Sequence, residues 1–563
     1  MLALCGEHYY CELLRMNMIR RFGGKVGSNH PGESIRPTWR FVTFVVFTLG
    51  LLTSARAATW YVDNTATGLN NGTSWTNAWT NITLISGVSA GDTVYISGGP
   101  VGSSQTYNLT GVGWPGLAGS SNNPITYIIG QDGTHSGVAV FNGGGVGNPT
   151  WITINGNYQN TGSHFVFTNV FPNAIAGNQL GFALRYTTVQ AAINLTGHLT
   201  ELDHVVIVPA YNSLSTDIVL TDNSAQAPVD NFVHDCTITA MRQAPLSGTG
   251  MCDCNTMTNI ALSGCGDWGL DISGGVTVSN CLFNTAAITN YATGTLSSNA
   301  KHGDAIQLNG ALTGSCSSVR ILGNTFLNWP QSAVVSYAGN YGCCVVFTNI
   351  WICNNVFDYT APDFAANASP CDGSWAIALY PLPPNVVPPF SNVIVANNTI
   401  VDQYGGGIAL GTYFTNGTGN AVVNNLVMTQ GGNGADVTTP VSASTSTIWV
   451  ACNKVTGVPS GCFDPSIQPP NNPGPLSTSP VTFVNWVPFS PGNDFHLAST
   501  DTGATGNGTN WPMQFFTADK DGNPRPSSGP WSLGAYEGGS GLGGAPPPGN
   551  NPPLRPKTMF LVK

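Results

Sequence analysis

Charged residues are the scarcest class in this chain, since only 8% of its 563 residues are Asp, Glu, Lys or Arg. Exposed positions of helices favour Glu, Lys and Arg, so this scarcity argues against a mainly helical fold. The 17 basic residues face 27 acidic ones and form no cluster in the body of the chain, which argues against nucleic-acid binding. By contrast, 42% of the residues are hydrophobic, which excludes wholesale disorder. The 69 Gly and 38 Pro suit short strands and tight turns.

The first 57 residues have the layout of a secretory signal. They hold seven of the basic residues, an apolar run over 41–52 follows, and Ala55-Arg56-Ala57 supplies a small-x-small cleavage pattern. The apolar run is too short to span a bilayer comfortably, although an uncleaved membrane anchor is the alternative. We therefore expect bacterial-type export of an acidic protein to the cell surface or the extracellular space, with no stable membrane span after cleavage.

Twelve cysteines follow position 57, and export would allow them to oxidise. Cys452 and Cys462 are close enough in sequence to form a disulfide, whereas Cys236 and Cys281 also fit small buried apolar positions. The spacings do not indicate a zinc site, and they do not fix the connectivity of any disulfides.

A six-residue pattern recurs along the body of the chain: apolar, any, any, small or amide, any, apolar. Such a period indicates a solenoid, and strand-rich units without helical periodicity indicate a parallel β-helix with coils stacked about 4.8 Å apart. We expect Asn at the fourth position to take a left-handed φ at the bend and to bond the next coil. Uneven spacing predicts loops of different length at one corner. The hexamers lie at 202–207, 233–238, 278–283, 321–326, 352–357, 395–400 and 422–427.

Several segments resemble secreted proteins of the pectate-lyase-like superfamily. Trp60-Tyr-Val-Asp63, Gly72-Thr-Ser-Trp75 and Gly91-Asp-Thr-Val-Tyr-Ile96 are similar to the opening of these proteins, and Leu533-Gly-Ala-Tyr-Glu537 is similar to their closing segment. With the repeats, the resemblance covers roughly residues 59–538. It implies an all-β fold, a single right-handed parallel β-helix. It implies no single activity, because the superfamily holds lyases, hydrolases, epimerases and non-catalytic adhesins.

The expected organisation follows from the signal, the repeats and the resemblance. The Gly- and Pro-rich end of the chain is typical of a disordered linker. We predict a signal peptide with a long leader at 1–57, an N-terminal cap at 58–90, the β-helix at 91–500, a closing segment at 501–538 and a disordered tail at 539–563.

One acidic stretch departs from the background of turns and strands. If Leu270 and Ile272 align as inward residues with Ile306 and Leu308 of the next coil, period-two alternation stacks Asp271 on Gln307 at the outer face. The reverse register would bury carboxylates without partners, at a high cost in free energy. This corner contains the candidate catalytic residues Lys301, His302, Asp304, Asp267, Asp271 and Arg242, and the candidate substrate-binding residues Gln307, Trp268, Arg320 and Tyr337.

Three chemistries fit this corner. In a lyase, a cation neutralises the uronate carboxylate while Lys301, Arg242 or His302 removes the neighbouring proton. Asp267, Asp271 and Asp304 would then hold Ca²⁺, which prefers oxygen ligands and is the one cofactor that the pattern suggests. A glycoside hydrolase would use two of these carboxylates as acid and base, and an epimerase would use the same groups without cleavage.

The segments 267–271 and 303–306 resemble motifs of the polygalacturonase family. Ala305 stands where that family has a second Asp, and its Gly-His-Gly and Arg-Ile-Lys motifs are missing, which argues against its hydrolytic mechanism. Asp residues near turns also often only cap backbone amides. Four further residues have no partners in register and are interpreted as structural: Arg185, His164, His198 and His496.

The sequence therefore predicts a secreted, monomeric carbohydrate-active protein that acts on an extracellular polysaccharide, with lyase-type cleavage of a uronate polymer preferred. The alternative from another class is a non-catalytic β-helical adhesin or structural protein. Scarce basic residues favour this alternative, because a lyase for acidic polymers needs cations along its groove. The acidic corner with Lys301 and His302 favours the enzyme.

Overall fold

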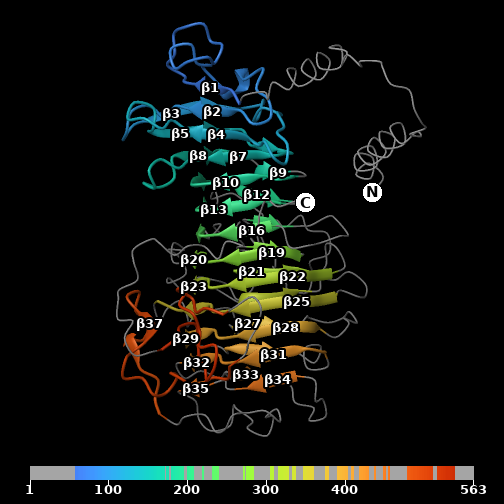
Figure 1. Cartoon of the computed structure of the whole chain (residues 1–563), viewed down its shortest axis with the longest axis vertical. Helices are drawn as coiled ribbons and strands as arrows, with labels where there is room; N and C mark the ends of the chain where they lie inside the picture. The colour runs from blue at the N-terminus through green and yellow to red at the C-terminus, as the bar shows by residue number, and fades with distance from the viewer. Residues whose placement is uncertain are drawn as a thin grey trace, which may run out of the picture. The chain divides into compact units, whose positions relative to one another are not determined.

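The computed structural model describes most of the chain after residue 56 and shows strands stacked coil upon coil (Figure 1). Three long parallel sheets form the faces of one right-handed parallel β-helix, which confirms the predicted fold class. No helix within the described ranges is long and apolar enough to cross a bilayer. The described residues are 57–170, 173–176, 179–195, 199–207, 218–220, 231–239, 270–272, 274–284, 305–309, 315–328, 332–337, 346–360, 375–379, 390–403, 407–410, 417–429, 437–438, 448–451, 454–456, 479–510 and 517–538.

From β4 to β33, each successive coil contributes one strand to each of the three sheets. The 13-stranded sheet contains, in order, β1 (Thr59–Val62), β2 (Thr93–Ile96), β4 (Ile125–Ile129), β7 (Ile152–Asn155), β10 (Ala183–Arg185), β13 (Glu201–Asp203), β16 (Asn231–His234), β19 (Gly274–Ser279), β22 (Ser315–Leu322), β25 (Val346–Cys353), β28 (Ser391–Ala396), β31 (Asn420–Val423) and β34 (Ile448–Ala451). The 12-stranded sheet contains β3 (Ser104–Asn108), β5 (Val138–Asn142), β8 (Phe165–Thr168), β11 (Thr187–Val189), β14 (Val206–Ile207), β17 (Thr237–Thr239), β20 (Leu282–Asn284), β23 (Thr325–Leu327), β26 (Val356–Asp358), β29 (Thr399–Gln403), β32 (Leu426–Thr429) and β35 (Lys454–Thr456).

The 10-stranded sheet contains β6 (Val146–Gly147), β9 (Asn173–Ala176), β12 (Ala192–Leu195), β15 (Ile218–Leu220), β18 (Leu270–Ile272), β21 (Ile306–Asn309), β24 (Ser332–Tyr337), β27 (Trp375–Leu379), β30 (Ile408–Leu410) and β33 (Val437–Thr438). Two further strands, β36 (Phe483–Asn485) and β37 (Asp494–Leu497), pair antiparallel with each other. A 3₁₀ turn, η1 (Ile82–Leu84), lies between β1 and β2.

The turn between the 13- and 12-stranded sheets has the same length in every coil that carries a hexamer. Two residues connect the strands, as His204 and Val205 connect β13 to β14. The left-handed residue is the third of the hexamer, with φ of 54° at His204 and 53° at Asp235, and not the fourth, so the predicted position of the bend was wrong. The third side chain projects at the outer side of the turn, where Asn, Asp and Gly tolerate a positive φ.

The fourth residue of each hexamer is buried and forms a ladder along the inside of the turn. The Oδ1 of Asn355 accepts hydrogen bonds from the backbone N and the Nδ2 of Asn324, at 2.9 and 3.1 Å. The same pattern joins Asn355 to Asn398 and Asn398 to Asn425. The expected bond between Asn amides of successive coils is thereby confirmed, and these buried amides are satisfied.

Loop length varies at the other two corners, which flank the 10-stranded sheet. The connection into this sheet runs from Thr239 to Leu270 in one coil and only from Leu327 to Ser332 in another. Insertions are tolerated there because they leave the stacked strands unchanged.

The C-terminal part of the chain folds back onto the outside of the β-helix. We call residues 479–510 and 517–538 the fold-back segment. It bonds third-position residues of the later coils: Asn354 donates to the Ala518 carbonyl at 2.7 Å, Asn424 to the Thr509 carbonyl at 2.9 Å, and Lys520 donates to the Gly323 carbonyl at 2.6 Å. The segment therefore lies along the constant turn.

This contact explains a change in the sequence pattern of the strands. In β4 buried and half-buried residues alternate, as expected for a sheet with one face on the core. In β31 every residue is buried, because Phe483, Trp531 and Leu533 of the fold-back segment cover its outer face. Consecutive residues of this strand can therefore both be apolar and buried, as Ala421, Val422 and Val423 are.

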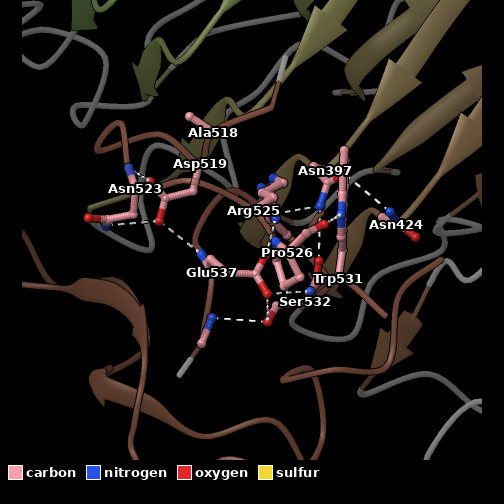
Figure 2. Close-up of polar contacts among 12 residues, drawn as sticks. Asn397, Asn424, Ala518, Asp519, Asn523, Arg525, Pro526, Trp531, Ser532 and Glu537 are labelled. Atoms are coloured by element: carbon pink, nitrogen blue, oxygen red, sulfur yellow. Dashed lines mark hydrogen bonds and ion pairs between the residues drawn. The ribbon is translucent and has the colours of Figure 1, made fainter. Parts of the chain in front are cut away.

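Arg525 is the centre of the polar contacts within the fold-back segment (Figure 2). Its fully buried guanidinium donates through Nη1 to Glu537 at 2.7 Å and through Nη2 to the Oδ1 of Asn354 at 2.8 Å. Asn397 donates from the β-helix to the carbonyls of Ser532 and Gly534 at 3.0 and 3.1 Å. These buried bonds fix the segment to the turn between the two sheets.

His496 on β37 supplies a pH-dependent contact within this segment. Its Nε2 lies 2.5 Å from Asp521, its Nδ1 contacts Asp494, and its ring packs on Tyr536. The hydrogen bond to Asp521 is the main cause that raises the pKa of His496 from 6.5 to about 9. The bond to Asp494 also raises this pKa, whereas burial lowers it. The stability that this charge contributes is complete below about pH 6.5 and is lost as the pH rises through about 9.

We therefore expect the fold-back segment to open more readily as the pH increases from neutral to about 10, past the raised pKa of His496. Hydrogen exchange of its amides, corrected for the intrinsic rate, measures this opening. His496→Gln should remove most of the pH dependence. The same dependence in wild type and variant would contradict the role given to His496.

Candidate active site

Consecutive strands of the 13-stranded sheet and the turns that follow them bring six ionisable side chains together at the outer side of the coils. Arg185 on β10 pairs in register with Asp203 on β13, and Asp203 pairs with His234 on β16. Leu202 and Val233 beside them are buried in the core, so the flanking residues face outward by alternation. We call this set the carboxylate–histidine cluster; it consists of Arg185, Glu201, Asp203, His204, His234 and Asp235.

Glu201 connects the first and third strands of the cluster. Arg185 donates to its Oε2 through Nε at 3.0 Å and also through Nη2. The Nε2 of His234 lies 3.1 Å from its Oε1. This carboxylate therefore bridges two cationic side chains from the coils on either side of it.

The dipeptides Asp203-His204 and His234-Asp235 lie one above the other in inverted order. Within each coil the histidine contacts its own neighbour: the Nδ1 of His204 lies 2.5 Å from Asp203 Oδ1, and the Nδ1 of His234 lies 2.8 Å from Asp235 Oδ2. Stacking adds a contact of 3.5 Å between His234 Nδ1 and Asp203 Oδ1. Side chains more than 30 residues apart thus form one charged network.

The contacts shift the pKa values of Glu201, His234 and His204. Burial alone would raise the pKa of Glu201, but hydrogen bonds from His234 and Arg185 and the Arg185 charge lower it to about 2. Burial would lower the pKa of His234, yet bonds to Asp235 and Glu201 and the charge of Asp203 raise it to about 10. The bond to Asp203 is the main cause that raises the pKa of His204.

Exposure divides the cluster into an inner and an outer part. The side chains of Asp203 and His234 are only 10% and 12% exposed, whereas those of Arg185 and His204 are 35% and 46% exposed. His204 also stacks on Tyr186, with ring centroids 4.4 Å apart. The rim of the cluster therefore contains Arg185 and His204, each bonded to an inner carboxylate, with Tyr186 stacked on the histidine.

Two triplets of the cluster could hold a metal ion. Glu201, Asp203 and His234 each place one ligand atom within 4.8 Å of the others, and so do Asp203, His204 and Asp235. Among the described residues these are the triplets of His, Cys, Asp and Glu with that geometry.

The predicted acidic corner is described only in part. Asp271 pairs in register with Gln307, and Leu270 and Ile272 pair with Ile306 and Leu308, as the alignment of the repeats predicts. Ile306 and Leu308 are fully buried, which confirms their inward direction. Six predicted residues lie outside the described ranges: Lys301, His302, Asp304, Asp267, Arg242 and Trp268.

The structure separates the remaining predicted residues between two faces. Tyr337 lies on β24 of the 10-stranded sheet and pairs with Asn309 of the coil that carries Gln307. Arg320 lies on β22 of the 13-stranded sheet, in register with Thr277 and Trp351. Arg320 is therefore on a different sheet from Asp271 and Gln307.

The sequence interpretation missed the cluster, although the repeat contains the signal for it. The interpretation of Arg185 and His496 as residues without partners in register was wrong, because both have carboxylate partners in the structure. Superimposing the hexamers 202–207 and 233–238 places Asp203 on His234 and His204 on Asp235. Among the cysteines, Cys236, Cys281 and Cys353 are buried free thiols and Cys316 is also buried, while Cys452 and Cys462 lie outside the described residues.

The three stacked parallel sheets place this chain among right-handed parallel β-helix proteins. No protein-family model matches the chain, and a search of curated proteins finds no match.

Solved structures similar to this chain include the pectate lyase Pel9A, with 15% identity over 86% of this chain and 96% of that one and a TM-score of 0.38. A rhamnogalacturonan lyase has 13% identity over 70% and 87% of the two chains, with a TM-score of 0.33. A lacto-N-biosidase from Eubacterium ramulus has 11% identity over 74% and 70%, with a TM-score of 0.28.

Proposed function

We propose that this protein is an exported carbohydrate-active enzyme that cleaves an extracellular uronate polymer by a lyase reaction at the carboxylate–histidine cluster. One observation supports the site above all: a half-exposed arginine and a half-exposed histidine lie at the rim of a buried acidic network. The arginine supplies a cation for the substrate carboxylate, and the histidine supplies a group that exchanges protons.

Arg185 binds the uronate carboxylate in this proposal. Its Nε and Nη2 donate to Glu201, and among the described residues its Nη1 has no hydrogen-bond partner. A guanidinium fixed on one edge presents its remaining donors without further loss of side-chain freedom. Its charge stabilises the negative charge that develops on the carboxylate when the neighbouring carbon loses a proton.

His204 moves the proton. Its Nδ1 is bonded to Asp203, so Nε2 is the nitrogen left for the substrate. Neutral His204 takes the proton from the carbon next to the carboxylate, the bond from the sugar to the glycosidic oxygen breaks, and a carbon–carbon double bond forms. His204 then returns the proton to the leaving oxygen.

A second candidate function is polysaccharide binding without cleavage. The mutual pairing of the cluster favours it, because Arg185 bonds Glu201 and His204 bonds Asp203, as in a structural network. The predicted acidic corner with Asp304 also stays a proposal for the catalytic site; its described residues Asp271 and Gln307 lie on the 10-stranded sheet.

A turnover assay on purified mature protein separates these possibilities. Pectate and alginate are incubated with it while the ultraviolet absorbance of the unsaturated product is followed. His204→Ala should lower the rate by about 100-fold or more, the range expected for a proton-transfer group. Arg185→Ala should also lower it by about 100-fold or more, the range expected for a donor that stabilises developing charge. The matched control is His164→Ala, which removes a half-buried histidine that is bonded to Thr161. This variant should keep wild-type activity.

Other results would replace the proposal. Loss of activity in Asp304→Ala with full activity in Arg185→Ala would move the site to the predicted corner. Release of reducing sugar without the absorbance would indicate hydrolysis. Binding of these polymers with no product would indicate the non-catalytic protein.

A further inference from the structure

The inner part of the carboxylate–histidine cluster has the donor set of a transition-metal site. Glu201, Asp203 and His234 supply two carboxylates and one imidazole from two adjacent coils, with ligand atoms within 4.8 Å of one another. The 3.1 Å between His234 Nε2 and Glu201 Oε1 is close to the spacing of about 3.3 Å between two ligands held about 2.0 Å from a tetrahedral ion.

The surroundings of these three residues resemble those of metal ligands. A metal-binding histidine usually donates its other ring nitrogen to a carboxylate, which fixes the direction of the ring. The Nδ1 of His234 has such a partner in Asp235, at 2.8 Å. Asp203 is held by the Nδ1 of His204 at 2.5 Å, and Glu201 is held by Arg185.

The metal class follows from the donor types. Ca²⁺ takes six to eight oxygen ligands, and a set with an imidazole nitrogen suits Zn²⁺, Mn²⁺ or a related divalent ion better. The nearly buried Asp203 and His234 exclude water from one side, and the exposed rim at His204 leaves the other side open. An open position permits exchange with solvent or with a substrate oxygen.

We propose that Glu201, Asp203 and the Nε2 of His234 bind one divalent transition-metal ion, with Asp235 orienting the imidazole. The inference deepens the proposed function in that it concerns the same cluster, but its evidence is independent of any polysaccharide. Arg185 and His204 are not ligands, so their proposed work on the substrate is compatible with an occupied site.

Metal binding to the full-length mature chain, freed of metal by a chelator, tests the proposal. Isothermal titration calorimetry with Zn²⁺, Mn²⁺, Co²⁺ and Ca²⁺ should show one binding site that prefers the transition metals. Bound Co²⁺ should give a visible absorption spectrum typical of nitrogen and oxygen ligands. His234→Ala should abolish this site. Asp235→Asn, which leaves the three ligands in place, should weaken affinity by about 10–100-fold.

The matched control is His496→Ala, which removes a histidine that also lies between two carboxylates and should leave affinity unchanged. Glu201→Gln retains the size of the side chain and guards against a loss of binding through misfolding. Preferential Ca²⁺ binding, or equal affinity in wild type, His234→Ala and Glu201→Gln, would overturn the proposal. The readout is metal binding, so a failure to cleave polysaccharide would not affect this result. Likewise, a failure to bind metal would not contradict polysaccharide cleavage.

Discussion

Replacing Arg525 with Met should lower the free energy of opening of the fold-back segment by about 3–5 kcal/mol relative to the wild type. The guanidinium is fully buried and bonds Glu537 and Asn354, so its removal leaves a poorly solvated carboxylate and an amide without their donor. Met retains much of the length of Arg525 and fills the space beside Trp531, over whose ring the guanidinium lies at 5.4 Å. The loss is therefore electrostatic and does not come from a cavity.

Hydrogen exchange of the fold-back amides measures this change in opening free energy. The double variant Arg525→Met with Glu537→Gln should recover part of the loss, because the carboxylate without a partner is then gone. A change below about 1 kcal/mol in the single variant would be typical of a solvent-exposed pair and would contradict the buried contact.

Truncating Phe326 to Ala should lower the free energy of unfolding of the β-helix by about 3–5 kcal/mol. Phe326 is fully buried and stacks between Phe283 and Phe357, with ring centroids 4.8 and 4.7 Å away. Its loss removes contacts with the coils on both sides at once. Neighbouring rings held by strand pairing cannot collapse into the space.

Denaturant unfolding followed by circular dichroism checks this value. Phe326→Leu keeps most of the volume and should cost less than about 1.5 kcal/mol. Equal and small effects of Ala and Leu would show that the ring is not enclosed between the adjacent coils.

The repeat predicted the fold because stacking makes each coil bury the same hexamer positions. Its alternation also predicted the register of Asp271 with Gln307, and that register is confirmed. The fold-back segment was outside the reach of this reasoning. Its contacts join residues such as Asn354 and Arg525, which are 171 positions apart and share no repeat. Only the loss of alternation in strands such as β31 indicates that a second layer covers them.

The site was harder to predict than the fold for a related reason. Acidic residues close in sequence drew attention to the stretch from Asp267 to Asp304, whereas the cluster is assembled from residues of three coils. Arg185, Asp203 and His234 meet because each stands at the same place in its strand. Reading the hexamers as a vertical column, and not only along the chain, brings out that meeting.

Cross-linking between coils tests the central claim most directly, since the cluster exists only if its strands are adjacent and in register. Directly paired residues of neighbouring strands lie about 5 Å apart, within the range that a disulfide spans. Oxidising the pair Asp203→Cys with His234→Cys should therefore give a cross-linked peptide in mass spectrometry. Asp203→Cys with Ser279→Cys, two coils apart, should give none. Equal cross-linking of the two pairs, or none in the first, would contradict the stacking on which the proposed site depends.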